Sequence, residues 1–348
     1  MYRLDTLEST PIALSPDPAG HAMRIAVIDD FQNVARQSAD WSSLPPDCEL
    51  TFFHDHLTDE RALVERLREF QVIVIMRERT PFPGSLIAAL PRLKLLVTTG
   101  PRNFSIDLEA ATRAGVLVCG TDSFGPPPAE LAWGLILALA RHIPFEDAAM
   151  RKGRWQTTLG TALSGKTLGL LGLGKLGTLT ARIGAAFGMD CIAWSQNLPP
   201  ARAVEAGAAP VAKDELFARA DVLSIHLVLS ERTRGLVGAR ELGLMKPSAF
   251  LVNTARGPIV DEAALIAALH ARRIAGAGLD VYDVEPLPER HPLRSLPNVV
   301  LTPHLGYVSA EGYCVMYGGA LGDILAFLEG KPLRALNSLD EQNKGTRT

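Results

Sequence analysis

The sequence has few cysteines and no long apolar run, and each absence excludes a class of protein. Its four cysteines lie far apart and form no C-x-x-C pair, so we expect buried reduced thiols rather than a redox or metal centre. The longest apolar stretch, residues 131–140, is about ten residues long, short of the ~20 that cross a bilayer. No apolar segment of a secretory signal opens the chain, so we expect a cytoplasmic protein without a membrane span.

An excess of basic charge is also missing. Lys and Arg number 35 against 38 Asp and Glu, and the scattered basic residues form no stripe, so we expect no nucleic-acid partner. The eight histidines form no H-E-x-x-H motif, so we expect no metal ion. What is present is ordinary for a folded chain: 348 residues, 47% of them hydrophobic and 21% charged, enough for about two domains.

The order of strand-like and helix-like segments predicts an α/β protein. Residues 1–22 have little periodicity, so we expect either a flexible extension there or a true start at Met23. Buried strand patterns then alternate with helical ones in two series, which predicts two lobes with parallel sheets. The expected strands are residues 23–30, 50–54, 72–76 and 94–98 in the first series, and 167–171, 190–194, 222–226, 250–253, 276–281 and 299–302 in the second. The expected helices are residues 58–70, 84–90, 129–141, 176–187 and 309–328, followed by a loose polar tail over residues 331–348.

A glycine-rich turn joins the first strand of the second series to a helix. It reads G-L-G-K-L-G, and the first glycine suits a tight turn, the second admits a pyrophosphate, and the third lets helix and strand pack closely. Because a strand precedes the turn and a helix and a second strand follow it, we expect a dinucleotide here, held by the amides at the start of the helix. The expected contacts are Gly172, Gly174, Lys175, Leu176 and Gly177.

A carboxylate is missing where such sites usually bind the ribose hydroxyls. The second strand ends at Trp194, and Ser195 and Gln196 follow it, so we expect these two residues beside the ribose. Without a negative charge there a 2′-phosphate is not repelled, and Arg202 is close in the sequence. We therefore favour NAD and leave NADP open.

Three ionisable residues stand just after expected strands of the second lobe. Arg256 follows the strand at 250–253, Glu285 the strand at 276–281, and His304 the strand at 299–302. Ligands bind at the carboxyl ends of parallel strands, so we expect all three side chains to face one cleft.

With these motifs the chain resembles the D-isomer-specific 2-hydroxyacid dehydrogenases. The resemblance implies two Rossmann-like, doubly wound domains with a cleft between them. They are a flavodoxin-like substrate domain, residues 23–127 plus 307–330, and an NAD(P)-binding domain, residues 128–306. It also implies hydride transfer between the nicotinamide and a D-2-hydroxy acid or 2-keto acid. The matching segments are residues 172–177, 221–227, 245–247, 250–261, 278–286 and 298–306.

The resemblance implies a role for each ionisable residue. His304 is then the acid/base, Glu285 orients its ring and favours the charged form, and Arg256 clamps the substrate carboxylate. Other implied cofactor contacts are Thr254, Ala255, Gly306, Asp280 and His226, of which Asp280 and His226 are also candidates for a purely structural role.

The substrate loop of the first lobe departs from the family pattern. Where relatives usually read G-x-G-x-D, Pro101 lacks an N–H and Arg102 replaces the second glycine. The expected substrate contacts are Gly100, Arg77 and Arg102, with the two arginines facing a second anionic group of the substrate. The alternative for Arg102 is an ordinary surface arginine.

Two further expectations concern partners and function class. The apolar surface of the helix that begins at residue 129 resembles the dimer face of the family, which implies a homodimer. Formate-oxidising relatives typically carry glutamine in place of Glu285, which argues against formate as the substrate. The alternative function is a corepressor-like protein that senses a nicotinamide nucleotide on the same fold.

Overall fold

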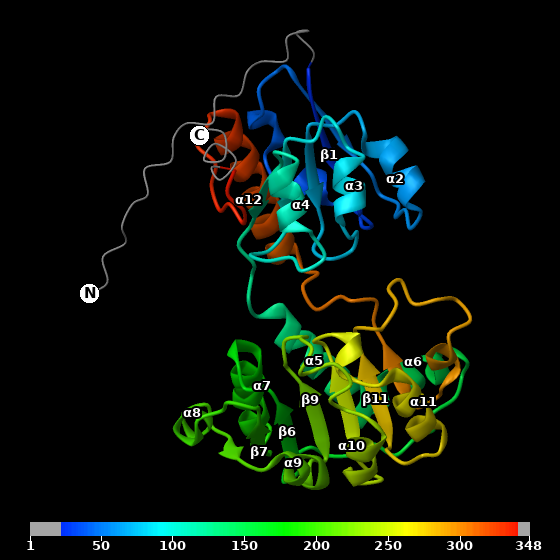
Figure 1. Ribbon diagram of the computed structural model, residues 1–348. Coiled ribbons are helices and arrows are strands. Elements are labelled where there is room, and N and C mark those ends of the chain that lie inside the picture. Colours follow the sequence, from blue (N-terminus) through cyan, green and yellow to red (C-terminus); the bar gives the residue numbers. More distant parts are fainter. Residues whose placement is uncertain (1–21, 340–348) are drawn as a thin grey trace. The chain divides into compact units, whose positions relative to one another are not determined.

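The computed structural model describes residues 22–339, which belong to two compact units. Of the described residues, unit 1 comprises 22–124 and 310–339, and unit 2 comprises Gly125–Ser309 (Figure 1). The sequence placed these boundaries at residues 127 and 306, a few residues away. The extension expected over residues 1–22 lies outside the described residues except for its last residue, and so does the end of the expected tail.

Unit 1 is built on a parallel sheet of five strands in the order β2-β1-β3-β4-β5. β3, β4 and β5 are buried along their whole length, as expected for a parallel sheet covered by helices. The order reverses at β1, which pairs with both β2 and β3. The strands are β1 Met23–Val27, β2 Cys48–Phe52, β3 Val72–Ile75, β4 Leu95–Thr98 and β5 Leu117–Gly120.

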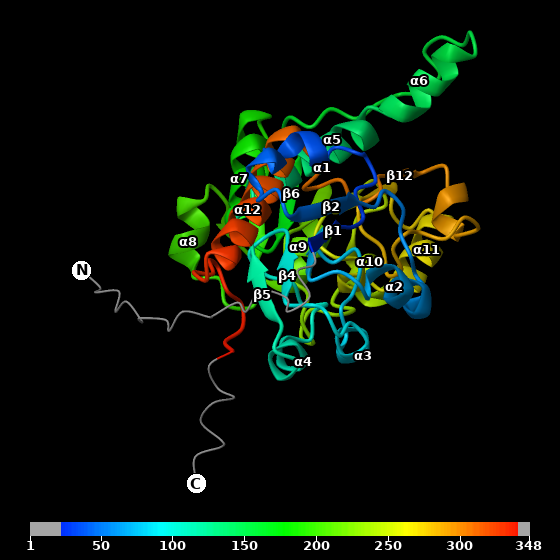
Figure 2. The same ribbon diagram turned by 90° about the horizontal axis from the view of Figure 1, so that it is seen from above.

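The helices of unit 1 cover both faces of this sheet. Figure 2 shows α1 and α12 on one face and α2, α3 and α4 on the other. Asp59 and Asp107 cap α2 and α4 by accepting hydrogen bonds from backbone N–H groups of the first turn. The sequence predicted α2, α3 and α12 but missed α1, α4 and β5. The helices are α1 Ala35–Ser38, α2 Glu60–Leu67, α3 Gly84–Ala88, α4 Leu108–Arg113 and α12 Ala310–Leu328, with a 3-10 turn at Trp41–Ser43.

The segment after α12 is held in unit 1. Gly120 N donates to Arg334 O at 3.1 Å, and Leu336 N donates to Val118 O at 2.7 Å, so the segment pairs with β5. The Arg334 guanidinium also lies 3.0 Å from Asp323 Oδ1 on α12. The expectation of a loose tail was therefore wrong for this stretch, because its polar groups find partners far away in the sequence.

Unit 2 contains a parallel sheet of seven strands in the order β12-β11-β10-β9-β6-β7-β8. The chain runs outward from β6 to β8 and then returns to β9, which lies on the other side of β6. This is the doubly wound, Rossmann-like topology, so the predicted α/β fold class is confirmed. Among the strands of this sheet the sequence missed only the short β8, but it also missed five helices of the unit, α6 and α8 to α11. The strands are β6 Thr167–Leu171, β7 Asp190–Trp194, β8 Ala209–Pro210, β9 Val222–Ile225, β10 Phe250–Asn253, β11 Gly276–Leu279 and β12 Val299–Leu301.

The first helix of unit 2, α5, buries most of its apolar side chains inside the unit. Trp133, Ile136 and Leu139 are at most 5% exposed, and α5 packs against α7, β10 and β11. Much of the surface expected at a dimer contact is therefore already covered. The helices of unit 2 are α5 Pro127–Ala140, α6 Ile143–Arg151, α7 Lys175–Ala186, α8 Pro200–Glu205, α9 Lys213–Arg219, α10 Ala239–Leu244 and α11 Glu262–His270, with 3-10 turns at Gly257–Ile259 and Pro292–Ser295.

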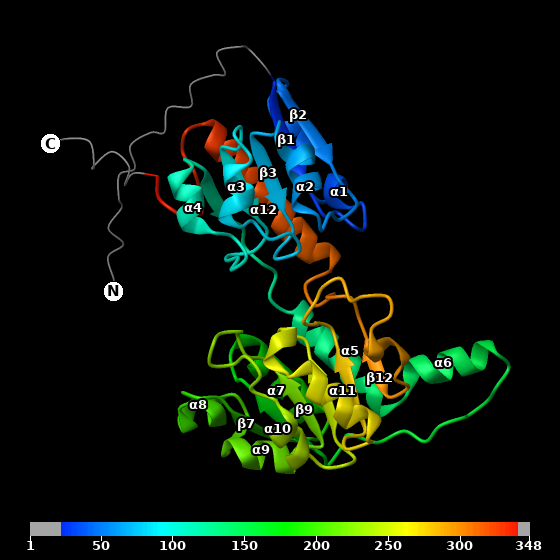
Figure 3. The same ribbon diagram turned by 45° about the vertical axis from the view of Figure 1, so that its right-hand side comes forward.

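Exposed apolar side chains of unit 2 gather instead on α6 and the segment that follows it. In Figure 3, α6 extends away from the sheet of unit 2. No helix within residues 22–339 has the length and apolar character that a membrane crossing requires. The exposed apolar residues of α6 and the segment that follows it are Ile143, Phe145, Met150, Trp155 and Leu159.

The free thiols are not all buried. Cys119 and Cys191 are buried and Cys48 is half-buried, but Cys314 on α12 is exposed, against the expectation of buried thiols. Burial raises the pKa of Cys119 to about 12, so this thiol stays protonated at neutral pH.

Candidate functional site

The glycine turn between β6 and α7 uses its three glycines differently. Gly172 has a φ of +100°, a conformation that residues with side chains rarely adopt. A Cβ on Gly177 would collide with the Gly172 carbonyl oxygen, whereas a Cβ on Gly174 would meet nothing within 4 Å. The open space beside Gly174 lies at the N terminus of α7, where unpaired backbone amides favour an anion. The turn therefore fits a pyrophosphate.

The edge next to this turn carries no carboxylate. β7 pairs with β6 and ends at Trp194, which is followed by the half-buried Ser195 and the exposed Gln196. Arg202, on α8, is exposed. Ser195, Gln196 and Arg202 thus offer hydroxyl, amide and guanidinium groups to a ligand.

The backbone of His226 packs against Gly172 of the glycine turn. It follows β9, and its carbonyl oxygen lies 2.8 Å from the position that a Cβ of Gly172 would take. Its Nε2 lies 2.9 Å from the hydroxyl of the fully buried Ser224. Burial lowers the pKa of His226 to about 4, so the ring is neutral at pH 7. These contacts favour the structural role, and a contact with the cofactor stays a prediction.

The stability of unit 2 should fall as the pH drops from about 6.5 to about 4. The unfolded chain protonates His226 near pH 6.5, whereas the folded protein does so only near pH 4, so acid favours unfolding in this window. The effect amounts to about 3 kcal/mol at most. Urea unfolding at neutral pH and at about pH 4.5 measures it, and His226→Gln should show a smaller loss. An equal loss in this variant would contradict the assignment to His226.

Asp280 is a fully buried carboxylate that orders the loop after β12. It accepts hydrogen bonds from Thr302 Oγ1 at 2.6 Å, Leu305 N at 2.7 Å and Gly306 N at 2.8 Å. Burial raises the pKa of Asp280, and these hydrogen bonds oppose the rise. Both carboxylate oxygens are engaged, so the geometry supports its structural role. Its contact with a nicotinamide stays a prediction.

His304 and Glu285 form a close pair at the carboxyl edge of the sheet of unit 2. His304 Nδ1 lies 2.6 Å from Glu285 Oε2, with the two side chains 25% and 34% exposed. His304 has a φ of +54° and is held there by its backbone N–H, which donates to Asp280 O and Thr302 O. The ring of Tyr307 packs against the imidazole edge to face at 5.5 Å. With Nδ1 engaged by the carboxylate, Nε2 is the ring nitrogen open to a further partner.

Arg256 lies in a loop after β10 that is held by hydrogen bonds of its own residues. Asn253, at the end of this strand, donates from Nδ2 to Arg256 O at 3.0 Å and accepts from Ala255 N at 3.0 Å. Arg256 Nη1 donates to Ala255 O at 2.7 Å, and the side chain is half-buried, like Thr254 and Ala255. The backbone of this loop is therefore fixed by its own polar groups.

The sheet order places these groups at one edge. β10, β11 and β12 are neighbours, so the loops that carry Arg256, Glu285 and His304 leave the same carboxyl edge as the glycine turn after β6. His304 contacts Glu285 directly. Arg256 is near this pair in the sheet because its strand, β10, is a neighbour of β11. Within residues 22–339, no three or more His, Cys, Asp or Glu side chains are arranged to hold a metal ion.

In unit 1, the expected substrate residues Arg77 and Gly100 lie against each other. Arg77 has a φ of +53° and donates from its backbone N–H to Thr99 Oγ1 at 2.9 Å. A Cβ on Gly100 would collide with the Arg77 guanidinium, so the glycine makes room for this group. Asn103, only 6% exposed, donates to Arg77 O at 2.7 Å and ties the two loops together. Arg102 is exposed.

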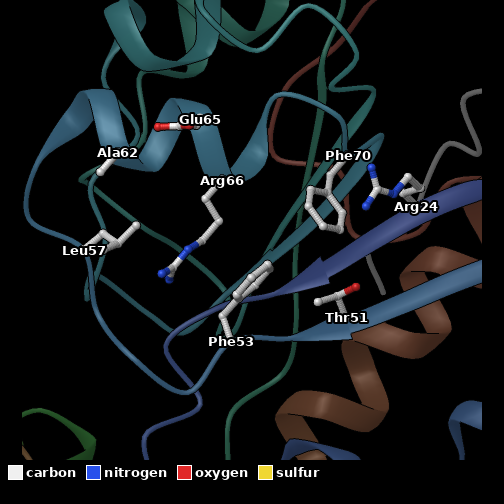
Figure 4. A pocket seen from close by; sticks show the side chains of 8 residues that line it. All are labelled: Arg24, Thr51, Phe53, Leu57, Ala62, Glu65, Arg66 and Phe70. Carbon is white, nitrogen blue, oxygen red and sulfur yellow. The ribbon is translucent and has the colours of Figure 1, made fainter.

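A separate pocket of about 450 Å³ lies on unit 1 (Figure 4). Its two arginines stack on its two aromatic rings: Arg24 on Phe70 at 4.9 Å and Arg66 on Phe53 at 4.8 Å. Arg66 also donates two hydrogen bonds to Asp55. Because the Arg66 guanidinium is already paired with Asp55, the two arginines do not form a joint anion site, and we assign the pocket no ligand. Its lining residues are Arg24, Thr51, Phe53, Leu57, Ala62, Glu65, Arg66 and Phe70.

Sequence reasoning missed three residues that contact the expected site residues. Tyr282 N donates to Glu285 Oε1 at 2.9 Å, Tyr307 packs on His304, and Asn103 binds the Arg77 loop. No local motif could have singled them out, because an aromatic residue after a strand is typical of the core and an asparagine in a loop is typical of a turn.

Comparisons with known proteins agree with this architecture. The family model described as D-isomer specific 2-hydroxyacid dehydrogenase, NAD binding domain, matches residues 133–306. A glyoxylate reductase of Aeropyrum pernix is 41% identical over 256 residues, 71% of this chain and 76% of that protein. A D-3-phosphoglycerate dehydrogenase of Mycobacterium tuberculosis is 40% identical over 241 residues, 68% of this chain, and the match spans only 46% of that protein.

A solved structure extends the likeness to both units. A phosphoglycerate oxidoreductase from Vibrio cholerae is 42% identical and superposes with a TM-score of 0.84 over 88% of this chain and 99% of that one. The chain therefore belongs to the D-isomer specific 2-hydroxyacid dehydrogenases, a family of oxidoreductases with an NAD binding domain.

Proposed function

We propose that the protein transfers a hydride between a nicotinamide dinucleotide and a D-2-hydroxy acid or its 2-keto acid. The observation that carries this proposal is the 2.6 Å contact between His304 Nδ1 and Glu285 Oε2, on the same sheet edge as the glycine turn. An imidazole that is paired on one nitrogen and open on the other is suited to move a proton to or from a hydroxyl oxygen. The dinucleotide, when bound, supplies the hydride acceptor or donor.

Each of the three ionisable residues has one task in this reaction. His304 Nε2 takes the hydroxyl proton during oxidation, as the hydride leaves the adjacent carbon, and returns a proton during reduction. Glu285 fixes the ring by its hydrogen bond to Nδ1 and stabilises the imidazolium. Arg256 donates to the substrate carboxylate and to the oxygen on which negative charge develops during reduction.

The geometry of unit 2 supports the proposed cofactor contacts. The open space beside Gly174 fits the pyrophosphate, and the edge at Ser195 and Gln196 fits the ribose. We propose NAD as the cofactor, although the absence of a carboxylate at this edge also admits NADP. The proposed contacts are Gly172, Gly174, Lys175, Leu176, Gly177, Ser195, Gln196, His226, Thr254, Ala255, Asp280 and Gly306.

Alanine substitutions should separate the two kinds of glycine in the turn. Gly174→Ala should keep the melting temperature but weaken NADH binding about tenfold or more, because the added methyl group fills the space beside the backbone amides. Gly177→Ala should instead lower the melting temperature, because its Cβ collides with the Gly172 carbonyl group. Thermal unfolding and fluorescence titration with NADH measure both effects. Unchanged NADH affinity in Gly174→Ala would place the pyrophosphate elsewhere.

Substrate binding also involves unit 1 in this proposal. Arg77, Gly100 and Arg102 are its substrate residues, and Asn103 keeps the Arg77 loop in place. Two guanidinium groups favour a substrate with a second anionic group beyond the 2-keto acid carboxylate.

The proposed oligomeric state is a homodimer. The apolar side chains exposed on α6 and the following segment, among them Trp155 at 72% and Leu159 at 93%, favour burial against a second copy of the chain. A cytoplasmic location stays a prediction from the sequence.

One experiment tests the reaction and the cofactor together. The purified protein is mixed with NADH or NADPH and a panel of 2-keto acids, some with a second carboxylate or a phosphate, and His304→Ala is assayed beside it. Turnover that collapses in the variant supports the dehydrogenase and identifies the substrate and the cofactor. Cofactor binding without turnover across the panel would favour the nucleotide-sensing alternative.

A further inference from the structure

We propose that Tyr282 is a positioning residue that holds the loops of Glu285, His304 and Arg256 in one arrangement. The inference rests on the proposed function, because it gives these three residues their tasks. Tyr282 follows β11, two residues beyond Asp280, and is 7% exposed. Its backbone contacts the loops of Glu285 and Arg256, and its hydroxyl contacts the loop of His304.

The first contact fixes the orientation of the Glu285 carboxylate. Tyr282 N donates to Glu285 Oε1 at 2.9 Å, while Glu285 Oε2 lies 2.6 Å from His304 Nδ1. One oxygen is thus anchored to the backbone and the other meets the imidazole. A carboxylate held at both oxygens cannot rotate without losing a hydrogen bond, so its plane is set before substrate arrives.

The second contact acts on the backbone of His304. The Tyr282 hydroxyl lies 2.9 Å from Thr302 O and 3.1 Å from Leu279 O, and donates its proton to these carbonyl groups. Thr302 O also accepts the backbone N–H of His304 at 3.1 Å. The phenol and the histidine amide therefore share one acceptor.

This shared acceptor matters because His304 adopts an uncommon backbone conformation. Its φ of +54° is rare for a residue with a side chain and persists only where the surroundings impose it. The Thr302 carbonyl is part of those surroundings, and Tyr282 holds it in place from the other side. Loss of the hydroxyl frees this carbonyl to turn and carry the His304 amide with it.

The third contact fixes the loop of Arg256. A Cβ on Gly257 would collide with the carbonyl group of Tyr282 and lie 2.7 Å from Asp283 N. Only a glycine next to Arg256 therefore allows the two backbones to touch. The position of Tyr282 sets how closely the Arg256 loop approaches the Glu285 loop.

The hydroxyl of Tyr282 stays a donor over the whole working range of pH. Burial raises its pKa, and the nearby negative charges of Asp280 and Glu285 raise it further. The hydrogen bond to Thr302 O is therefore not lost by titration.

Tyr282→Phe tests the proposal, because it removes only the hydroxyl and keeps the ring. We expect kcat to fall about tenfold while KM for the keto acid changes less than about twofold, since positioning acts on the reaction step. Tyr313→Phe is the matched control. Tyr313 is a buried tyrosine of unit 1 whose hydroxyl is also hydrogen-bonded, and its loss should lower stability to a similar degree without this fall in kcat.

A second readout does not depend on turnover. The proton between His304 Nδ1 and Glu285 Oε2 should give a far-downfield ¹H NMR signal, assigned by its disappearance in His304→Asn. In Tyr282→Phe we expect this signal to move upfield or broaden, while Tyr313→Phe leaves it in place. An unchanged signal and an unchanged kcat in Tyr282→Phe would overturn the proposal.

A substitution next to Arg256 tests whether the position of the Tyr282 backbone affects the His304–Glu285 pair. Gly257→Ala pushes on the Tyr282 carbonyl group, so it should also perturb the downfield signal, whereas Gly243→Ala, whose Cβ would meet nothing within 4 Å, should not. A signal untouched in folded Gly257→Ala contradicts the coupling. If His304→Asn keeps full turnover, the proposed function fails, yet the NMR signals still decide whether Tyr282 positions the imidazole.

Discussion

Asparagine in place of His304 is expected to lower kcat for keto acid reduction by about 10²–10⁴-fold, the range that a positioned acid–base group contributes. Asparagine can still donate a hydrogen bond to Glu285, but it cannot deliver a proton to the substrate oxygen. The affinity for NADH should change less than about twofold, because the glycine turn lies on another strand. Steady-state NADH oxidation and a fluorescence titration measure the two quantities.

The chain offers a matched control for this substitution. His291 is also paired with a glutamate, since its Nε2 lies 3.0 Å from Glu262 Oε1. His291→Asn removes a histidine–carboxylate pair of the same unit and should keep kcat within about twofold of the parent. If His304→Asn is folded and retains a kcat like that of His291→Asn, His304 is not the proton donor.

Lysine in place of Arg256 is expected to lower kcat/KM by about 10²–10³-fold, the loss typical of removing a donor that faces developing negative charge. Lysine keeps the positive charge but loses the planar fork that binds a carboxylate through two parallel hydrogen bonds. Both kcat and KM should change, since the fork binds the substrate carboxylate in the ground state and the reacting oxygen in the transition state. Initial rates over a range of keto acid concentrations separate the two terms.

Arg240→Lys is the control for the loss of a guanidinium fork. Arg240 donates two hydrogen bonds to Asp214, at 3.0 and 2.5 Å, on the exposed surface of unit 2. Its replacement should leave kcat/KM within about twofold of the parent, because surface ion pairs contribute little. A kcat/KM in Arg256→Lys equal to that of this control would remove Arg256 from the mechanism.

Sequence patterns found most of the two sheets because their signals are local. Buried strands such as Val72–Ile75 and Phe250–Asn253 are short apolar runs between turns, and the glycine turn at residues 172–177 has its own fingerprint. The two missed strands have weak local signals. β8 is only two residues long, and β5 ends in Cys-Gly, which is not typical of a strand.

A partner that lies far away in the sequence explains why the expectation of a loose tail was wrong. The tail after α12 is polar and looked loose, yet Leu336 N donates to Val118 O across more than two hundred positions of the chain. The apolar side of α5 packs for the most part on β10, β11 and α7, and its role in a dimer stays a prediction. Composition records that a segment is polar or apolar but not which element covers it.

The sequence by itself determined the α/β class, the glycine turn and the presence of Arg256, Glu285 and His304 after three strands, because strand order and motif spacing are properties of the chain. Only the tertiary structure decided which oxygen of Glu285 meets the imidazole and that the Tyr282 hydroxyl and the His304 amide share the Thr302 carbonyl. Such contacts depend on the register of β11 against β12 and on the backbone angles of the loops that follow. A hydrogen bond forms only within a narrow range of distances, and a pattern of residues does not specify distances on that scale.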